Sequence, residues 1–392
     1  MTKQKLVYIL SGLGLYFIVT GLSFAGFSFF AKGNSSAQVV TSPVGVSPGV
    51  KPKYKVDPSV PRDQVCPLDG EMYTKQEKDI WDTRRPLAVM IENSEEARPQ
   101  SGISRADIVY EALAEGWITR FMAVFYCNTP MENITVAPVR SARTYFVDWV
   151  SEYDALYNHV GGAGMCDDDT VDTRAKALCQ IRQFGIKDMD QFGIGFPDCY
   201  RNPDRLDHPV ATEHTMVCFS ENLYKIASNR GWTNVDENGV SWDKNFTEWS
   251  FKDDPSAADL GTVTKVKLVF APGYDKYDVM WQYDKATNSY KRFNGGVPHI
   301  DLENKQQLTA KNVVVQLTKL TGPVDEHGHL LYTTIGSGKA LIFQDGKVVV
   351  GTWSKKSRVS RTMFYGPNGK QVSFTRGPIW IEVLPSEQQV TY

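Results

Sequence analysis

After residue 84, apolar positions occur in short runs separated by polar turns. Residues 86–93 read PLAVMIEN, a run that is typical of a buried strand. Residues 106–127 contain two runs of β-forming residues with Glu115-Gly116 near their junction, which predicts an antiparallel hairpin. Residues 135–139 predict a further strand. This part of the chain therefore contributes several buried strands.

Helical spacing alternates with these strands. Ser141 is a residue type that often caps helices, and the pattern after it predicts a helix to Val150. Residues 155–162 predict another strand, and apolar positions three or four apart predict helices over residues 169–184 and 221–230. The alternation predicts a mixed α/β or α+β domain over residues 63–235.

Helix signals disappear after Trp242. Short apolar runs continue in series, and Asp345-Gly346 and Asn368-Gly369 are dipeptides that two-residue hairpins prefer. Residues 240–386 are therefore predicted to form a second, β-rich domain, a sandwich or barrel-like sheet.

The N-terminal segment has a different pattern. Residues 6–31 carry no charge and follow Lys3 and Lys5. A membrane-spanning helix needs about 20 apolar residues, whereas the apolar part of a signal peptide has roughly 7–15. Residues 1–31 are thus predicted to be a single transmembrane helix, retained as a signal anchor, with cleavage near Ala25 or Ala31 as the alternative. The Pro/Ser/Gly-rich residues 32–62 predict an extended tether, which places the domains outside the cytoplasm at the cell membrane.

Cysteine content and charge narrow the class of protein. All six cysteines follow the tether, and an even number in an exported segment is compatible with disulfides. Their pairing stays open, and a plain buried thiol is the simplest interpretation of Cys127. A net charge of −2 gives no attraction to nucleic acid.

Several familiar chemistries lack support. Gly336-Ser337-Gly338-Lys339 is followed by Ala340 where a phosphate loop needs Ser or Thr. His327-Gly328-His329 is interpreted as a surface turn, and Asp167-Asp168-Asp169 lacks the spacing of a calcium loop. The sequence predicts no cofactor and no metal site.

A dense set of polar residues follows the predicted strands of the first domain. Positions 107, 111 and 115 would share one face of a strand, because side chains alternate with a period of two. Strand ends and the loops after them commonly carry ligand sites. The candidate residues are Asn93, Arg98, Asp107, Glu111, Glu115, Arg120, Arg140, Ser141, Arg143 and His159.

Arg140 and Arg143 flank the predicted helix start at Ser141. A helix start already carries partial positive charge, so cations there are mildly unfavourable without a negative partner. One interpretation is an internal network in which the arginines pair with Asp107, Glu111 and Glu115. The other is that the arginines exceed what internal carboxylates neutralise and receive an anionic ligand.

Three segments of the chain resemble a known family. Residues 84–93, 97–121 and 137–146 are similar to the bacterial YerB-like proteins, with weaker similarity at 213–215, which includes His214, and at 336–353. The resemblance implies an exported envelope protein, often anchored as a lipoprotein, with N- and C-terminal domains of unknown function. A lipoprotein needs a cysteine after its apolar segment, and residues 1–65 contain none.

These features lead to two functional hypotheses. The first is a binding protein for an anionic cell-wall polymer or an envelope protein, with ligand contacts from the arginines, Asn93, Asp107, Ser141 and His214. The second is an enzyme acting on wall glycan, in which Glu111 or Glu115 is the general acid and a second carboxylate is the base or nucleophile. His159 is a further candidate for acid–base chemistry.

Overall fold

The computed structural model describes residues 57, 59–129 and 132–392. The predicted transmembrane helix at residues 1–31 and most of the predicted tether at 32–62 lie outside the described residues. Within the described part, every helix is too short or too polar to cross a bilayer.

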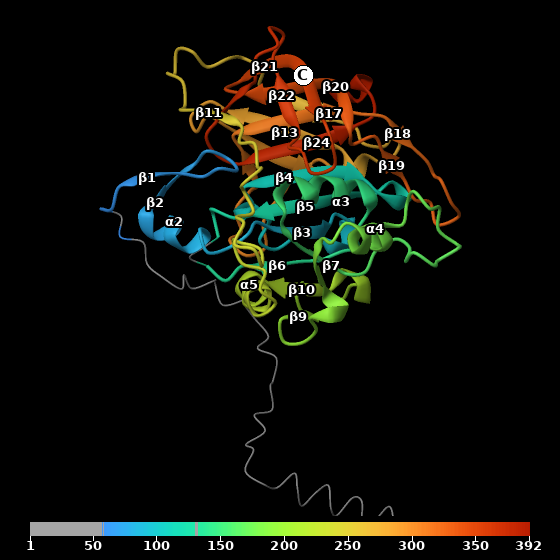
Figure 1. Ribbon diagram of the computed structural model, residues 1–392. Helices are drawn as coiled ribbons and strands as arrows, with labels where there is room; N and C mark the ends of the chain where they lie inside the picture. The colour runs from blue at the N-terminus through green and yellow to red at the C-terminus, as the bar shows by residue number, and fades with distance from the viewer. Residues whose placement is uncertain (1–56, 58, 130–131) are drawn as a thin grey trace, which may run out of the picture. The chain divides into compact units, whose positions relative to one another are not determined.

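A ten-stranded sheet runs through both halves of the chain (Figure 1). The orange and red strands of the second half continue directly into the teal strands of the first. In order across the sheet the strands are β22 (Met363–Tyr365), β21 (Lys347–Lys355), β20 (Gly336–Gln344), β17 (Asn312–Leu317), β24 (Ile379–Leu384), β4 (Ile108–Leu113), β5 (Thr119–Phe125), β3 (Leu87–Glu92), β7 (Leu156–His159) and β8 (Lys187–Asp190).

The two halves meet at β24, which pairs in parallel with β17 on one side and with β4 on the other. Glu382 of β24 lies opposite Glu111 of β4 in this register. Both strands are buried along their whole length, which explains their nearly continuous apolar sequences. The predicted division into domains at 63–235 and 240–386 stays a prediction, but strands from both segments share this sheet.

Both faces of the central strands are covered. On one face, Trp149 of α3 (Thr144–Val150) stacks on Tyr110 of β4 with ring centroids 5.3 Å apart. On the other face, Trp281 Nε1 donates a hydrogen bond of 2.8 Å to Glu382 Oε1. Trp281 belongs to a second sheet, which comprises β15 (Val297–Pro298), β14 (Ser289–Asn294), β13 (Val279–Asp284), β12 (Lys265–Leu268), β25 (Val390–Thr391) and β16 (Thr309–Ala310).

The remaining elements are short. The small sheets comprise β1 (Arg62–Val65) with β2 (Met72–Thr74), β6 (Thr135–Val136) with β10 (Met216–Phe219) and β9 (Cys199–Arg201), β11 (Ser250–Lys252) with β23 (Ser373–Thr375), and β18 (Leu320–Thr321) with β19 (Leu331–Tyr332). The other α-helices are α2 (Lys75–Trp81), α4 (Ala177–Gln183) and α5 (Ser220–Asn229).

The predicted fold class is wrong. We expected a mixed α/β domain followed by a β-rich domain, with one transmembrane helix. The described residues instead form a mostly β structure with four α-helices, of which the longest has 10 residues. The predicted helix over residues 169–184 is reduced to α4, because the preceding loop turns at Asp172 and is joined to the helix by a disulfide.

The predicted helix start at Ser141 is also wrong. Helix α3 begins at Thr144, and Arg143 is its N-cap residue without a side-chain cap. Ala142 forms a parallel bridge to Gly162, and its N–H donates to the Gly161 carbonyl. This strand-like pairing keeps the backbone extended before the helix.

The six cysteines form three disulfides: Cys66–Cys127, Cys166–Cys179 and Cys199–Cys218. The interpretation of Cys127 as a plain thiol is therefore wrong. The predicted strand at 86–93, the hairpin at 106–127 and the helix at 221–230 are confirmed as β3, β4–β5 and α5.

Candidate functional site

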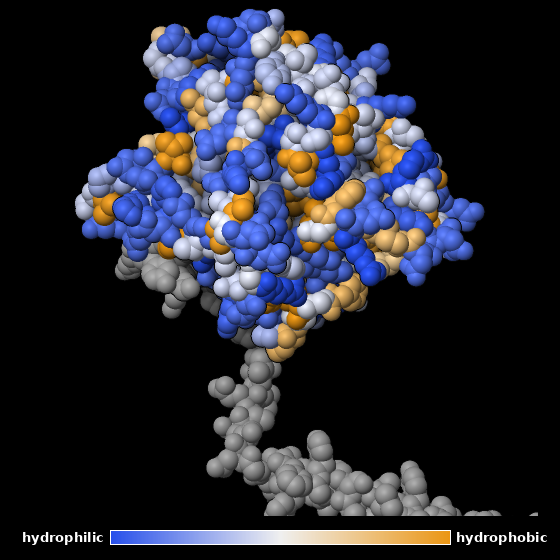
Figure 2. Space-filling model, viewed as in Figure 1, coloured by the Kyte–Doolittle hydropathy of each residue, from blue (hydrophilic) through white to orange (hydrophobic). Residues whose placement is uncertain are grey.

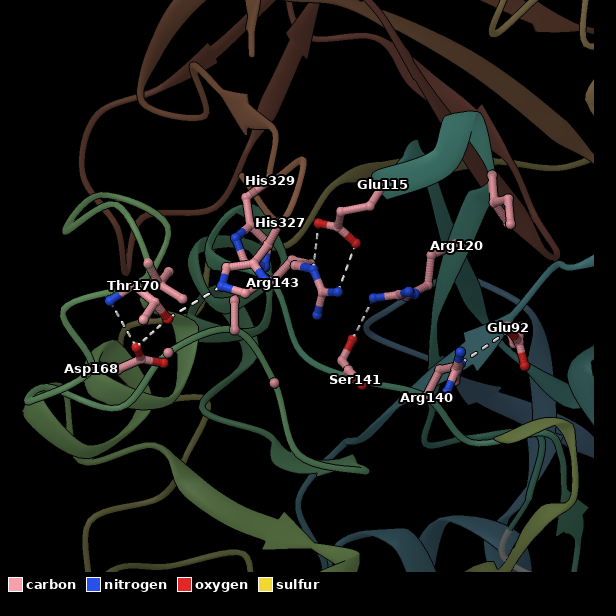
Figure 3. A pocket seen from close by; sticks show the side chains of 15 residues that line it. Glu92, Glu115, Arg120, Arg140, Ser141, Arg143, Asp168, Thr170, His327 and His329 are labelled. Atoms are coloured by element: carbon pink, nitrogen blue, oxygen red, sulfur yellow. Dashed lines mark hydrogen bonds and ion pairs between the residues drawn. The ribbon is translucent and has the colours of Figure 1, made fainter. Parts of the chain in front are cut away.

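A solvent-open pocket of about 500 Å³ lies beside the ends of β3, β5 and β7 (Figure 3). Its walls come from the first half of the chain and from one turn of the second half. The lining residues are Glu92, Glu115, Ile118, Arg120, Arg140, Ser141, Arg143, Gly162, Ala163, Gly164, Asp168, Thr170, Val171, His327 and His329.

Arg143 and Glu115 neutralise each other in the pocket wall. Arg143 Nε and Nη2 each lie 2.6 Å from an oxygen of Glu115, and Arg143 Nη1 donates to the carbonyl of Ala142 at 2.7 Å. Burial alone would raise the pKa of Glu115, but the charge and hydrogen bonds of Arg143 outweigh it and lower that pKa to about 2. Glu115 is therefore ionised at neutral pH.

Arg140 belongs to a second polar chain. Its Nε lies 3.0 Å from Glu92 Oε1, and the other oxygen of Glu92 lies 2.8 Å from His214 Nδ1. Among the described residues, the Nη1 and Nη2 groups of Arg140 make no hydrogen bond, and the side chain is 27% exposed in the pocket. Arg140 can therefore still donate to a ligand.

Arg120 has no carboxylate partner among the described residues, although it is only 8% exposed. Its Nη1 donates a 2.9 Å hydrogen bond to the Ser141 carbonyl, which leaves Nε and Nη2 without a protein acceptor. Burial and then the nearby Arg143 charge lower the pKa of Arg120 to about 10. An anion in the pocket would relieve this repulsion.

The other predicted candidates lie away from this pocket. The three carboxylates expected on one strand face have separate environments, because only Glu111 lies within β4. Asp107 precedes the strand and accepts hydrogen bonds from the N–H groups of Tyr126, Cys127 and Asn128. Burial raises the pKa of Asp107 to about 7 despite these bonds. Glu115 lies in the turn after the strand.

Glu111 belongs to a fully buried network between the two sheets. Arg292 of β14 pairs with Glu111 through Nη2 and with Glu382 through Nη1, and all three side chains are inaccessible to solvent. Arg292 Nε also donates to His299 Nδ1 at 3.0 Å. Burial and then the adjacent Glu111 charge raise the pKa of Glu382 well above its usual value, which favours its neutral form.

Asn93 and Arg98 connect the halves of the chain. Asn93 Oδ1 accepts from Arg98 Nε at 3.1 Å and from Asn294 Nδ2 at 2.8 Å, and Arg98 Nη1 donates to the Lys276 carbonyl. Asn93 and Arg98 therefore hold the two halves of the chain together and do not line the pocket. His159 is buried outside the pocket, with Nδ1 donating to the Gly161 carbonyl and Nε2 3.1 Å from Asp188 Oδ1.

The structure thus brings together Glu115, Arg120, Arg140, Ser141 and Arg143, with His214 behind Glu92. Glu92 also lines the pocket, and its position at the end of the first apolar run did not mark it as a site residue. Asp168, Thr170 and His327 had no predicted role, because loops far apart in sequence carry no spacing signal. The only metal-like cluster in the described ranges, Cys66–Asp107–Cys127, contains two disulfide-bonded sulfurs.

Both halves of the chain match domains of a known protein family. Residues 70–233 match the family described as "Protein of unknown function (DUF3048) N-terminal domain", and residues 267–381 match its C-terminal domain. The chain belongs to the YerB-like DUF3048 family. "Putative lipoprotein YerB" of Bacillus subtilis (strain 168) is 29% identical over 321 residues, which cover 82% of this chain and 86% of the relative.

The fold is similar to a solved relative as well. The crystal structure of YerB protein from Bacillus subtilis superimposes with a TM-score of 0.68 at 26% identity, covering 84% of this chain and 99% of the other. The resemblance found in the sequence is therefore confirmed. Since the matched domains are described as having unknown function, the chemistry of the pocket carries the functional argument.

Proposed function

We propose that this protein is an extracytoplasmic, membrane-associated binding protein of the cell envelope. Its pocket would bind the anionic group of a cell-wall component or partner protein through Arg120 and Arg140. Three disulfides support a location outside the cytoplasm, because disulfides persist in oxidising compartments. The name of the relative, a lipoprotein, supports retention at the membrane.

The observation that carries the proposal is the unpaired guanidinium of Arg120. The pocket wall contains three arginines, and two of them already pair with Glu92 and Glu115. Arg120 shares the nearby charge of Glu115 with Arg143 and has no ion pair of its own, and a bound anion would supply charge-assisted hydrogen bonds to this buried cation. Arg120 has no carboxylate within ion-pair distance among the described residues, which supports an anion-binding role for this arginine.

The surface also favours a polar ligand. The face shown in Figure 2 is mainly hydrophilic, and its apolar patches are small and separated. Large contiguous apolar patches commonly mark docking surfaces for apolar partners. The pocket itself is lined mainly by charged and polar side chains, which fits recognition of a charged group.

The geometry does not favour the enzyme hypothesis. A general acid must carry a proton near neutral pH, but Arg143 keeps Glu115 ionised. Glu111 lies in the buried network with Arg292, and His159 lies outside the pocket. We therefore favour binding over hydrolysis of wall glycan.

The test is cosedimentation of the purified protein with isolated anionic wall polymer. We expect the double variant Arg120→Gln/Arg140→Ala to bind at least tenfold more weakly than wild type. Exposed Arg182 of α4 provides the matched control, because Arg182→Ala removes a positive charge away from the pocket. Equal retention of wild type and the double variant, with circular dichroism showing both folded, would contradict the proposal.

A further inference from the structure

The volume of the pocket indicates more than a small inorganic anion. Its volume of about 500 Å³ lies within the range typical of sites for organic ligands, roughly 300–1,000 Å³. Arg120 and Arg140 occupy one side of this space, to the right in Figure 3. An acidic group bound there would leave the opposite side to the rest of the ligand.

Two loops form that opposite side, and direct contacts join them. Asp168 and Thr170 come from the loop after Gly164, and His327 comes from a turn of the second half. Thr170 Oγ1 lies 3.2 Å from His327 Nε2, and the N–H of Asp172 donates to Asp325 Oδ2 at 3.1 Å. The Cys166–Cys179 disulfide closes the base of the first loop.

Asp168 presents a free acceptor on this wall. Its Oδ1 accepts from the backbone N–H of Thr170 at 3.0 Å and from its hydroxyl at 2.6 Å. Its Oδ2 makes no hydrogen bond to any described residue. Figure 3 shows Asp168 and Thr170 together, on the side of the pocket away from Arg120 and Arg140.

The chemistry of this wall favours hydroxyl groups. A carboxylate with a free oxygen accepts from O–H donors or from an ammonium group. Lys176 already contributes positive charge near Asp168, so a neutral donor fits better than a second cation. Apart from Ile118, Val171 and Ala163, the lining provides little apolar surface for a hydrocarbon group.

We infer that the pocket binds a polyhydroxylated anion, in which a phosphate or carboxylate group is carried on a sugar or polyol. The acidic group contacts Arg120 and Arg140, and a hydroxyl of the same molecule donates to Asp168 Oδ2. This inference rests on the proposed anion-binding function and specifies the class of ligand. The buried Arg120 guanidinium, aimed into the pocket without a counter-ion, is the observation that fixes the acidic end.

Isothermal titration of the purified full chain tests the inference with four probes: inorganic phosphate, glycerol 1-phosphate, glucuronate and neutral glucose. We expect at least one hydroxylated anion to bind about tenfold more tightly than inorganic phosphate, as one additional hydrogen bond to a charged group supplies. Glucose should not bind measurably. The tighter of the two hydroxylated anions identifies the acidic group as phosphate or carboxylate.

Asp168→Asn makes the test specific. The variant retains Oδ1 for the turn with Thr170 but replaces the free acceptor with an N–H donor. We expect it to lose the preference for hydroxylated anions while binding inorganic phosphate as wild type does. Asp169→Asn, a change at the exposed neighbouring residue outside the pocket lining, should keep the preference.

The outcomes separate the two proposals. If inorganic phosphate binds as tightly as both hydroxylated anions, the ligand class is wrong while the anion site remains. If Asp168→Asn keeps the full preference, the assigned hydroxyl contact is wrong. If no anion binds to the wild-type protein, both the proposed function and this inference fail.

Discussion

Glu115 and Arg143 form a two-point ion pair in the pocket wall, with both nitrogen–oxygen distances at 2.6 Å. Because each guanidinium nitrogen in the pair meets its own carboxylate oxygen, the charge of Arg143 is matched within the protein. Arg120, next to this pair, has no such match. Arg143 therefore has a structural role, whereas Arg120 is available to a ligand.

The ion pair predicts a pH-dependent contribution to stability. The pKa of Glu115 is about 2 in the folded protein against an ordinary value of 4.5, so its contribution is complete above pH 4.5 and lost as pH falls towards 2. Glu115→Gln should lower the free energy of unfolding by about 2–3 kcal/mol at pH 7. Urea unfolding from pH 7 to pH 2 should show this difference shrinking below pH 4.5.

Glu237→Gln, at an exposed position, serves as the control and should change stability little. A difference between wild type and Glu115→Gln that stays constant across the pH range would contradict the assignment.

The buried charge of Arg120 should lower the free energy of unfolding of the protein when no ligand is bound. Arg120→Met removes a buried charge that has no direct ion pair, at similar volume, so we expect the free energy of unfolding to rise by about 1 kcal/mol. Phosphate should raise the Tm of wild type but not of this variant, because ligands stabilise the state that binds them. Differential scanning calorimetry measures both effects, with Arg182→Met as the control. A loss of several kcal/mol would show that Arg120 is structural.

Substitutions in the buried network of Glu111, Arg292 and Glu382 should change the free energy of unfolding far more than substitution of Arg120. Arg292→Met leaves Glu111 buried without its cation and should lower the free energy of unfolding by about 3–5 kcal/mol. Because Glu382 favours its neutral form, adding Glu111→Gln should recover more stability than adding Glu382→Gln. Guanidinium unfolding of the two double variants compares them directly, and equal recovery would argue that both carboxylates share the charge.

The disulfides should differ in their contributions. Cys66–Cys127 joins residues 61 apart, and replacing both cysteines by serine should cost about 4 kcal/mol in the chain-entropy description. Cys166–Cys179 joins residues 13 apart, and its removal should cost about 3 kcal/mol. Urea unfolding of the two double-serine variants would test this order, and a larger loss for the shorter loop would contradict it.

Local patterns predicted much of the first half correctly. The apolar run ending at Glu92 and the two runs around Glu115-Gly116 form β3, β4 and β5, because strand pairing across a short turn depends on adjacent sequence. The helix at Ser141 failed for a tertiary reason. Ala142 pairs with Gly162, a residue that local propensity does not take into account.

The site was only partly visible in the sequence. Arg120, Arg140, Arg143 and Glu115 were identified by residue type and by their proximity to strand ends, and they do line one pocket. The sequence pattern also grouped Glu111 with these residues, because it gives no sign that Glu111 pairs with Arg292. Arg292 lies in the second half, and nothing in the spacing of β14 indicates that it reaches β4.

The position of β24 has a consequence for how the protein matures. Residues 379–384 insert between β17 and β4, so the middle of the largest sheet is completed by a segment that is synthesised after both of its neighbours. A growing chain that has reached only residue 378 presents two open strand edges with no neighbour to cover them. Assembly of the native sheet must therefore wait until residues 379–384 have been synthesised, and a premature stop before Ile379 would remove the central join between the halves.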